Sequence, residues 1–223
     1  MTAVTTRRLL AVAIGLAAIL DIRAVLAGDT AQEYVFKPLA TALILLLAAT
    51  GPAPVHASPR ALVVIGLVAS LAGDVFLMLP GDRFVPGLAA FLAAHVLYTV
   101  AFTRDGWRAT GWPALACGLY VAALLWWVLP GAGRVQGPVT VYALVIGTMA
   151  WQALQRALAW RTTGPVLAAA GAVLFVVSDS ALAVNRFVEP FWWAPIAVMG
   201  TYVPAQWLIA SSAGGGWLAG RER

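Results

Sequence analysis

The chain has 223 residues, of which 62% are hydrophobic and only 10% are charged. A soluble domain is typically near half apolar and a quarter charged, so this composition excludes one. The net charge of +5 would suit a nucleic-acid partner. However, the arginines lie between apolar segments and form no basic stripe, so we predict no nucleic-acid binding. The single cysteine, Cys117, excludes a disulfide scaffold.

Apolar segments follow one another along the chain, separated by proline, glycine or charged residues. There are eight of them, and they cover residues 9–27, 36–50, 61–79, 85–103, 112–129, 139–158, 165–184 and 191–212. A membrane helix takes about 20 residues. Lipid leaves no partner for an unpaired backbone group, and the segments lack the strict alternation of barrel strands. We therefore predict an all-α fold, a polytopic bundle of eight transmembrane helices in a single membrane domain, 1–223.

Basic residues fall unequally on the two sides of such a bundle. With eight helices, both termini lie on one side. That side carries nine of the 14 basic residues: Arg7, Arg8, Arg60, Arg104, Arg108, Arg156, Arg161, Arg221 and Arg223. Because Lys and Arg are enriched in cytoplasmic loops, we predict a multi-pass protein of the cell membrane with both termini in the cytoplasm.

The first segment has a second interpretation. Arg7 and Arg8 precede an apolar run that ends at Ala27, which is also the pattern of a cleavable signal peptide. Asp21 and Arg23 interrupt that run and favour a retained first helix. Near a membrane surface both side chains can snorkel or form a pair, so we interpret them as structural.

The two halves of the chain resemble each other. Asp74 near the end of the third segment is followed 24 residues later by Tyr98, and Asp179 near the end of the seventh is followed 23 residues later by Tyr202. This spacing suggests two parallel four-helix halves with the aspartates in equivalent positions. Chance similarity between apolar sequences is the alternative.

Asp74 and Asp179, like Asp21, lie inside predicted spans, where an ionisable group costs roughly 2.5–3.5 kcal/mol and is a functional candidate by default. Ser70 precedes Asp74 by one turn, and Ser178 and Ser180 flank Asp179. Each of these hydroxyls can hydrogen-bond a carboxyl group. We interpret Asp74 and Asp179 as functional.

Lys37 lies with the aspartates in the non-cytoplasmic half of the predicted membrane, and other polar residues lie deeper. His95 is followed one turn later by Tyr98, while Tyr202 and Gln206 are four apart and share a helix face. His95 is either functional or a buried histidine that is hydrogen-bonded across helices. Lys37 is the only lysine beside thirteen arginines. We predict that these groups line one cavity that opens on the non-cytoplasmic side.

Common catalytic motifs are missing from the sequence. It contains no G-x-S-x-G elbow, zinc-binding H-E-x-x-H, P-loop or dinucleotide fingerprint. A hydrolytic set of Ser178, His95 and Asp74 can be drawn, but it rests on no spacing rule. The two histidines, His56 and His95, make a metal site possible, but they provide few ligands for it. We expect neither a metal nor a cofactor.

Several motifs occur in a fixed order between Lys37 and Gln206. They are Lys37-Pro38, Ser70-x-x-Gly73-Asp74-x-Phe76-Leu77-Met78, Phe84-x-x-Gly87-x-x-x-Phe91-x-x-x-His95-x-x-Tyr98, Gly171-x-x-Leu174-Phe175-x-x-Ser178-Asp179-Ser180, Asn185 and Tyr202-x-x-x-Gln206. Together these motifs resemble the YhhN-like lysoplasmalogenase family of eight-helix membrane proteins.

The resemblance implies a function and roles for residues. Characterised animal members hydrolyse the vinyl ether bond of lysoplasmalogens and release a fatty aldehyde and glycerophospho-ethanolamine or -choline. The motifs assign the two essential aspartates of the family to Asp74 and Asp179. Lys37 is then expected to hold either the ionised aspartate or the lipid phosphate. The groups expected to orient water and headgroup are His95, Tyr98, Asn185, Tyr202 and Gln206.

Vinyl ether hydrolysis needs an acid, a base for water and a negative charge beside a developing cation, and two carboxyl groups can supply all three. The sequence does not indicate which aspartate has which role. The expected partners are a lysophospholipid substrate and membrane lipid. The alternatives are a small transporter or lipid-binding protein that uses the same carboxylates, and a hydrolase of another lysolipid.

Overall fold

The computed structural model describes residues 3–51, 57–109 and 111–214, and these residues form helices and connections only. His56, Arg221 and Arg223 lie outside them. The described helices are α1 (Ala3–Ala27), α2 (Thr30–Ala49), α3 (Ala57–Met78), α4 (Phe84–Phe102), α5 (Trp112–Ala132), the short 3-10 helix η1 (Gly133–Val135), α6 (Gln136–Trp160), α7 (Thr163–Phe187) and α8 (Ala194–Ser212). The predicted all-α class is confirmed.

Six stretches of the described chain are long and apolar enough to cross a membrane: 5–27, 30–49, 59–78, 84–102, 112–160 and 163–187. The stretch 112–160 contains both α5 and α6. Helix α8 is not among these stretches. The presence of several membrane-spanning helices is therefore established, while the number of eight transmembrane helices stays a prediction.

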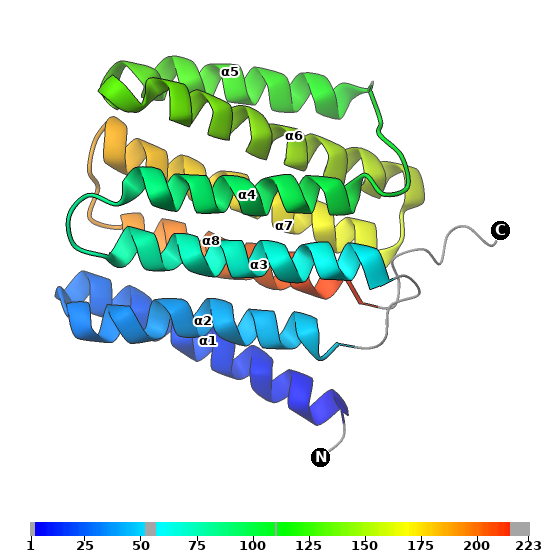
Figure 1. The fold of residues 1–223 in the computed structure, drawn as a ribbon, viewed down its shortest axis with the longest axis horizontal. Coiled ribbons are helices and arrows are strands. Elements are labelled where there is room, and N and C mark those ends of the chain that lie inside the picture. The colour runs from blue at the N-terminus through cyan, green and yellow to red at the C-terminus, as the bar shows by residue number, and fades with distance from the viewer. Residues whose placement is uncertain (1–2, 52–56, 110, 215–223) are drawn as a thin grey trace.

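The helices run along the long axis of one bundle (Figure 1). Helix α1 begins, and α8 ends, at the same end of the bundle, as an even number of alternating passes requires (Figure 1). We call the opposite end, formed by the α1–α2, α3–α4, α5–α6 and α7–α8 connections, the distal end. Helix α3 packs on α4 and α7 on α8, while α2 contacts α8 and α4 contacts α6. These contacts are consistent with the proposed repeat, which stays a prediction.

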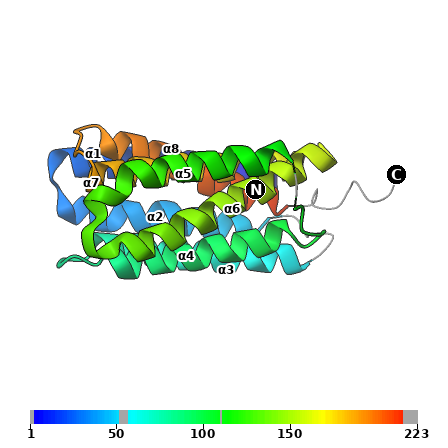
Figure 2. The ribbon, with the colours of Figure 1, turned by 90° about the horizontal axis from the view of Figure 1, so that it is seen from above.

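Helices α1 and α5 lie at opposite edges of the bundle in Figure 1, and Figure 2 shows the bundle from the side of α5. Helix α5 packs mainly on α6, with fewer contacts to α7 and η1. Its exposed large apolar residues include Leu115, Leu119 and Trp126. Large apolar side chains that are exposed on a membrane helix face lipid. Helix α1 packs on α2 and α8 and contributes Ile14 and Ala17 to the buried core.

Helix α2 begins six residues before the predicted segment. The Asp29 side chain accepts a hydrogen bond from the Gln32 backbone N–H at 3.1 Å and caps the helix. Such a cap satisfies one of the four free N–H groups at a helix start. The polar first turn therefore stays helical although it is not apolar, which is why hydropathy alone placed the start too late.

A buried ion pair holds the α4–α5 connection against α6. The Asp105 carboxylate accepts hydrogen bonds from Arg156 Nε at 3.1 Å and from the Trp160 indole, and Arg108 lies at 3.4 Å. Beside it, Gln152 bonds both the N–H and the C=O of Arg108, at 3.2 and 3.0 Å. The connection is thus fixed to α6 at the end of the bundle where the described chain begins and ends.

We expect this cluster to make stability depend on pH in the acid range. Burial alone would raise the pKa of Asp105, but Arg156, Arg108 and Trp160 together hold the pKa below its usual value of 3.8. A lowered pKa contributes stability that is complete above about pH 4 and is lost as the pH falls through the folded-state pKa. In detergent, the unfolding temperature should therefore fall below about pH 4 more steeply in the wild type than in Asp105→Asn. Equal acid dependence in both proteins would contradict this assignment.

Candidate active site

Asp74 lies where three helices meet. It projects from α3, is 1% exposed, and its Oδ2 atom accepts hydrogen bonds from the Thr41 hydroxyl of α2 at 2.6 Å and the Tyr202 hydroxyl of α8 at 2.8 Å. Buried polar groups are stable when they are paired in this way. The contact pattern explains how a carboxyl group is accommodated inside an apolar bundle.

The hydrogen bonds continue from Asp74 to α4. Gln206 Nε2 donates to the Tyr202 hydroxyl at 3.2 Å, and the Tyr98 hydroxyl donates to Gln206 Oε1 at 2.9 Å. Three residues predicted to support the site, Tyr98, Tyr202 and Gln206, are thus brought together with Asp74. Chains of this kind fix the orientation of each member, because every hydrogen bond restricts the groups on both of its sides.

Asp179 occupies a second position in the same interior. It projects from α7 and accepts a hydrogen bond from the Tyr142 hydroxyl of α6. It also borders two small cavities of about 50 and 40 Å³, one of which is lined by Phe91 and Leu182. Cavities of this size are large enough for a water molecule where polar partners are present. Asp179 therefore borders cavities that can hold a water molecule, whereas the Asp74 side chain is enclosed by its neighbours.

Aromatic rings join the two aspartates into one cluster. His95 is fully buried, with its ring centroid 5.2 Å from that of Tyr142 and 4.5 Å from that of Phe175. Phe175 in turn lies 5.4 Å from Tyr202, measured between ring centroids. Direct contacts thus lead from Tyr142, the partner of Asp179, to Tyr202, the partner of Asp74. A continuous set of packed rings therefore connects the hydrogen-bond partners of the two carboxyl groups.

His95 and the serines differ from what the sequence indicated. Neither ring nitrogen of His95 has a hydrogen-bond partner within the described part of the chain, so the expected bond across helices is absent there. Ser178 donates to the backbone oxygen of Val198 at 3.1 Å. The drawn set of Ser178, His95 and Asp74 is therefore not formed among these residues.

The carboxyl groups are held by two residues that the sequence analysis missed. Ser70 is buried one turn from Asp74, but the hydrogen bonds to that carboxylate come from Thr41 and Tyr202. Thr41 lies on α2 and Tyr142 on α6, the equivalent helices of the proposed halves. Neither hydroxyl stands out in the sequence, because its hydrogen-bond partner depends on how the helices pack.

A polar cavity of about 550 Å³ opens at the distal end between α1, α2, α7 and α8. We call it the distal cavity, and its polar lining consists of Asp21, Glu33, Lys37 and Asn185. Asp21 is 0% exposed and neither carboxylate oxygen has a hydrogen-bond partner among the described residues. The interpretation that Asp21 snorkels or pairs is therefore wrong, because neighbouring helices cover it. Arg23 is exposed and donates to Gln32 Oε1 at 3.1 Å, as a residue near a surface can.

The distal cavity adjoins the region of the two aspartates. Lys37 is one turn before Thr41 on α2, and Leu182, which lines both this cavity and a cavity of Asp179, is three residues beyond Asp179 on α7. One helical turn is about 5 Å. Asn185 Oδ1 accepts the Phe191 backbone N–H at 3.0 Å and so positions the α7–α8 connection at the rim.

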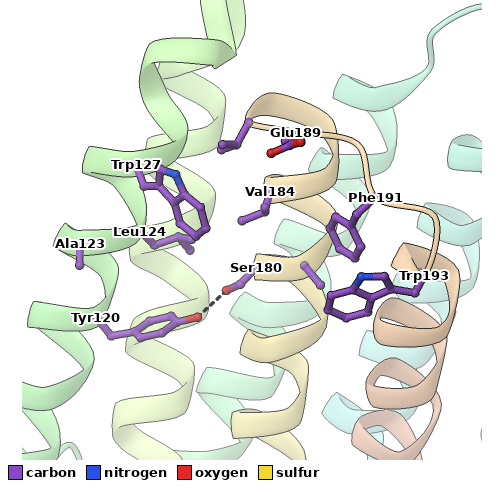
Figure 3. Close-up of a pocket in the computed structure, with 11 residues that line it drawn as sticks. Tyr120, Ala123, Leu124, Trp127, Ser180, Val184, Glu189, Phe191 and Trp193 are labelled. Carbon is purple, nitrogen blue, oxygen red and sulfur yellow. Dashed lines mark hydrogen bonds between the residues drawn. The ribbon is translucent and has the colours of Figure 1, made fainter.

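A second, mostly apolar cavity of about 570 Å³ lies between α5 and α7 (Figure 3). We call it the α5–α7 groove, and its apolar lining includes Leu124, Trp127, Val184 and Trp193 (Figure 3). The Tyr120 hydroxyl donates to Ser180 Oγ at 2.8 Å across its inner end (Figure 3). Tyr120, Leu124 and Ser180 also line the cavity that contains Asp179 and Tyr142. The groove is thus separated from Asp179 only by this shared wall.

Metal-ligating side chains do not gather anywhere in the described chain, where no group of three or more His, Cys, Asp or Glu residues could hold a metal ion. The carboxyl groups of the site are instead held by hydroxyl groups, as shown above.

These features define a helical membrane protein with a buried site of two carboxyl groups between a polar cavity and an apolar groove. The model of the YhhN family matches residues 32–213, and the chain belongs to that family. The membrane protein YhhN of Escherichia coli O6:H1 is 34% identical over 173 residues, which cover 75% of this chain and 80% of the relative.

Animal relatives carry an enzymatic name. Lysoplasmalogenase TMEM86A of Homo sapiens is 36% identical over 184 residues, covering 77% of this chain and 73% of the relative. Lysoplasmalogenase TMEM86A of Bos taurus is 38% identical over 161 residues, covering 67% of this chain and 63% of the relative. No solved structure matches the chain.

Proposed function

We propose that the protein is a membrane hydrolase that cleaves the vinyl ether bond of lysoplasmalogens. Its products would be a fatty aldehyde and glycerophospho-ethanolamine or -choline. Relatives named lysoplasmalogenase support this proposal. The observation that carries it is the single aromatic cluster that joins Asp74 and Asp179, placed between a polar cavity and an apolar groove.

The proposed reaction consumes one water molecule. An acid first transfers a proton to the β-carbon of the vinyl ether, which turns the C=C–O unit into an oxocarbenium ion. Water then adds to the carbon attached to oxygen and loses a proton to the carboxylate that the acid has become, giving a hemiacetal and restoring the acid. The hemiacetal then breaks its bond to the glycerol oxygen while its hydroxyl proton is passed to that oxygen, and it yields aldehyde and alcohol. Carboxyl groups do this work beside a similar cation in glycosidases.

We assign the acid to Asp179 and the stabilising carboxylate to Asp74. Asp179 borders cavities that a substrate atom or water can enter, whereas Asp74 is enclosed. Asp74 receives two hydrogen bonds from hydroxyl groups, an arrangement that suits an ionised carboxylate. Tyr202, which donates a hydrogen bond to Asp74, would lie between the Asp74 charge and the reacting carbon. Tyr142 would orient Asp179.

The α5–α7 groove is the proposed seat of the fatty chain. It is almost entirely apolar, faces the lipid side of α5, and shares a wall with the cavity of Asp179. A single-chain lipid could therefore keep its tail in the groove while its ether bond reaches the carboxyl groups. The hydrogen bond between Tyr120 and Ser180 would open to admit it.

Filling the groove should weaken substrate binding. Ala123 lines the groove, whereas the neighbouring Ala122 is exposed and does not. We expect Ala123→Trp to raise KM for a long-chain lysoplasmalogen by about tenfold or more, since about 1.4 kcal/mol of lost apolar contact has this effect. Ala122→Trp is the matched control and should leave KM unchanged. Equal kinetics of the two variants would place the chain elsewhere.

The function itself is tested by incubating the purified protein in detergent with lysoplasmalogen and measuring free aldehyde. We expect aldehyde release that depends on protein and ceases with an ester lysolipid of the same chain length. A transporter or lipid-binding protein would release none, because it breaks no bond. Absence of product across a panel of ether and ester lysolipids would overturn the proposal.

We further propose that both termini face the cytoplasm, which would open the distal cavity to the opposite side. Seven arginines of the described chain lie toward the end where it begins and ends: Arg7, Arg8, Arg60, Arg104, Arg108, Arg156 and Arg161. The positive-inside rule places that end in the cytoplasm. A fluorescent protein fused to the C-terminus should fold and fluoresce only in that orientation.

A further inference from the structure

The distal cavity contains a buried carboxylate that the proposed reaction does not use. Asp21 lines the cavity, is 0% exposed, and has no hydrogen-bond partner on either oxygen among the described residues. A carboxylate is costly to bury without a partner. A buried carboxylate in the lining of a cavity indicates a ligand that carries a positive charge.

Charges of both signs face the same space. Lys37 lies seven residues after the start of α2 and Asp21 six residues before the end of α1, so the two stand at similar depth on adjacent antiparallel helices. Their side chains share the cavity without forming a hydrogen bond to each other. Glu33 adds a second carboxylate one turn nearer the rim, and Trp192 adds an aromatic face. The lining thus complements a ligand with one anionic and one cationic group.

An aminoalcohol phosphate has this charge pattern. Its phosphate can bind an ammonium group as a point charge, and its own ammonium or quaternary ammonium group binds carboxylates and aromatic faces. Lys37 lies one turn, or about 5 Å along α2, from Thr41, the partner of Asp74. Leu182 lines both this cavity and a cavity of Asp179. A glycerol unit of three carbons spans a comparable distance between a phosphate and an ether oxygen. A headgroup in the cavity would therefore place the ether bond beside the aspartates.

We propose that the distal cavity recognises the aminoalcohol phosphate headgroup of the substrate, with Lys37 bound to the phosphate and Asp21, assisted by Glu33, bound to the ammonium group. This inference rests on the proposed function, because it takes a lysolipid as the ligand. It makes Asp21 a residue that determines headgroup specificity and leaves the chemistry to Asp74 and Asp179.

Two lysoplasmalogens of equal chain length, one with a choline and one with a glycerol headgroup, provide the test. We expect the wild type to favour choline in kcat/KM by at least about tenfold, because only the choline headgroup carries the cation that the Asp21 and Glu33 carboxylates attract; tenfold corresponds to about 1.4 kcal/mol. Asp21→Asn should bring this ratio close to one by losing turnover of the choline lipid alone. Asp21→Glu keeps the charge and should restore part of the preference. Asp82→Asn is the control, because Asp82 is an exposed acid outside the cavity.

A binding measurement separates this inference from the function. Glycerophosphocholine carries the headgroup without the chain, and it should raise the unfolding temperature of the wild type and of Asp82→Asn but not of Asp21→Asn. An unchanged choline preference in Asp21→Asn, or an equal loss with both lipids, would overturn the headgroup assignment. If the wild type released no aldehyde from any lipid, the proposed function would fail. Stabilisation by glycerophosphocholine that requires Asp21 would then still support the site.

Discussion

Asp179→Asn and Asp74→Asn should each lower the rate of aldehyde release by about 10²–10⁴-fold, the contribution of a positioned acid or base. The amide of asparagine keeps the size of the side chain and can still accept the hydrogen bond from Tyr142 or Tyr202. It can neither deliver a proton to carbon nor carry a negative charge beside an oxocarbenium ion. The loss should therefore appear in kcat, while the protein stays folded.

The double variant separates a joint role from two independent roles. If the two carboxyl groups act in one step, Asp74→Asn combined with Asp179→Asn should be little worse than either single variant, because residues that act as a unit are not additive. Asp82→Asn, at an exposed ion pair with Arg186, should keep wild-type turnover. Turnover near wild type in either single variant would contradict the two-carboxylate mechanism.

The largest loss of stability is expected for Asp105→Ala, at about 3–5 kcal/mol. Asp105 and Arg156 form an ion pair in which both side chains are 1% exposed. The change removes the carboxylate and leaves the buried charge of Arg156 without that counter-ion. The Asp82 and Arg186 pair is the natural comparison, since its side chains are 70% and 38% exposed. Asp82→Ala should cost only about 0–1 kcal/mol because water already solvates that pair.

Unfolding curves of the three proteins in one detergent measure this difference. Asp105→Ala should unfold at a clearly lower temperature than the wild type, and Asp82→Ala at nearly the same temperature. Equal shifts in both variants would mean that the Asp105 cluster does not anchor the α4–α5 connection to α6. Replacing Asp105 and Arg156 together by apolar residues should recover much of the loss, because no buried charge then remains.

Apolar segments in the sequence located the helices well, since lipid demands long runs that satisfy their own backbone. Their ends were less predictable because a helix continues through polar residues when a cap supplies hydrogen bonds, as Asp29 does for α2. Helix α8 was predicted as a span, but it is not among the stretches of the described chain that are apolar enough to cross a membrane. It packs against α7 and buries Tyr202 and Gln206, so its composition reflects contacts inside the bundle as well as lipid.

The candidate site could be anticipated in its acids but not in all their partners. Asp74 and Asp179 stand out because carboxyl groups are rare inside membrane spans. Thr41 and Tyr142 do not stand out, because a hydroxyl group in an apolar run is common and its target depends on how the helices pack. Asp21 was misinterpreted for the same reason. Its sequence position indicates a membrane surface, whereas packing encloses it at the distal cavity.

Hydrolysis in heavy water tests the central claim, that an aspartic acid delivers a proton to the vinyl ether carbon, most directly. The wild-type protein in D₂O, with the aldehyde trapped at once by reduction, should give a product with one deuterium on the carbon next to the former carbonyl group. Asp179→Asn should give this product at least about 10²-fold more slowly. An aldehyde without deuterium at that carbon, or equal release by Asp179→Asn, would contradict the mechanism.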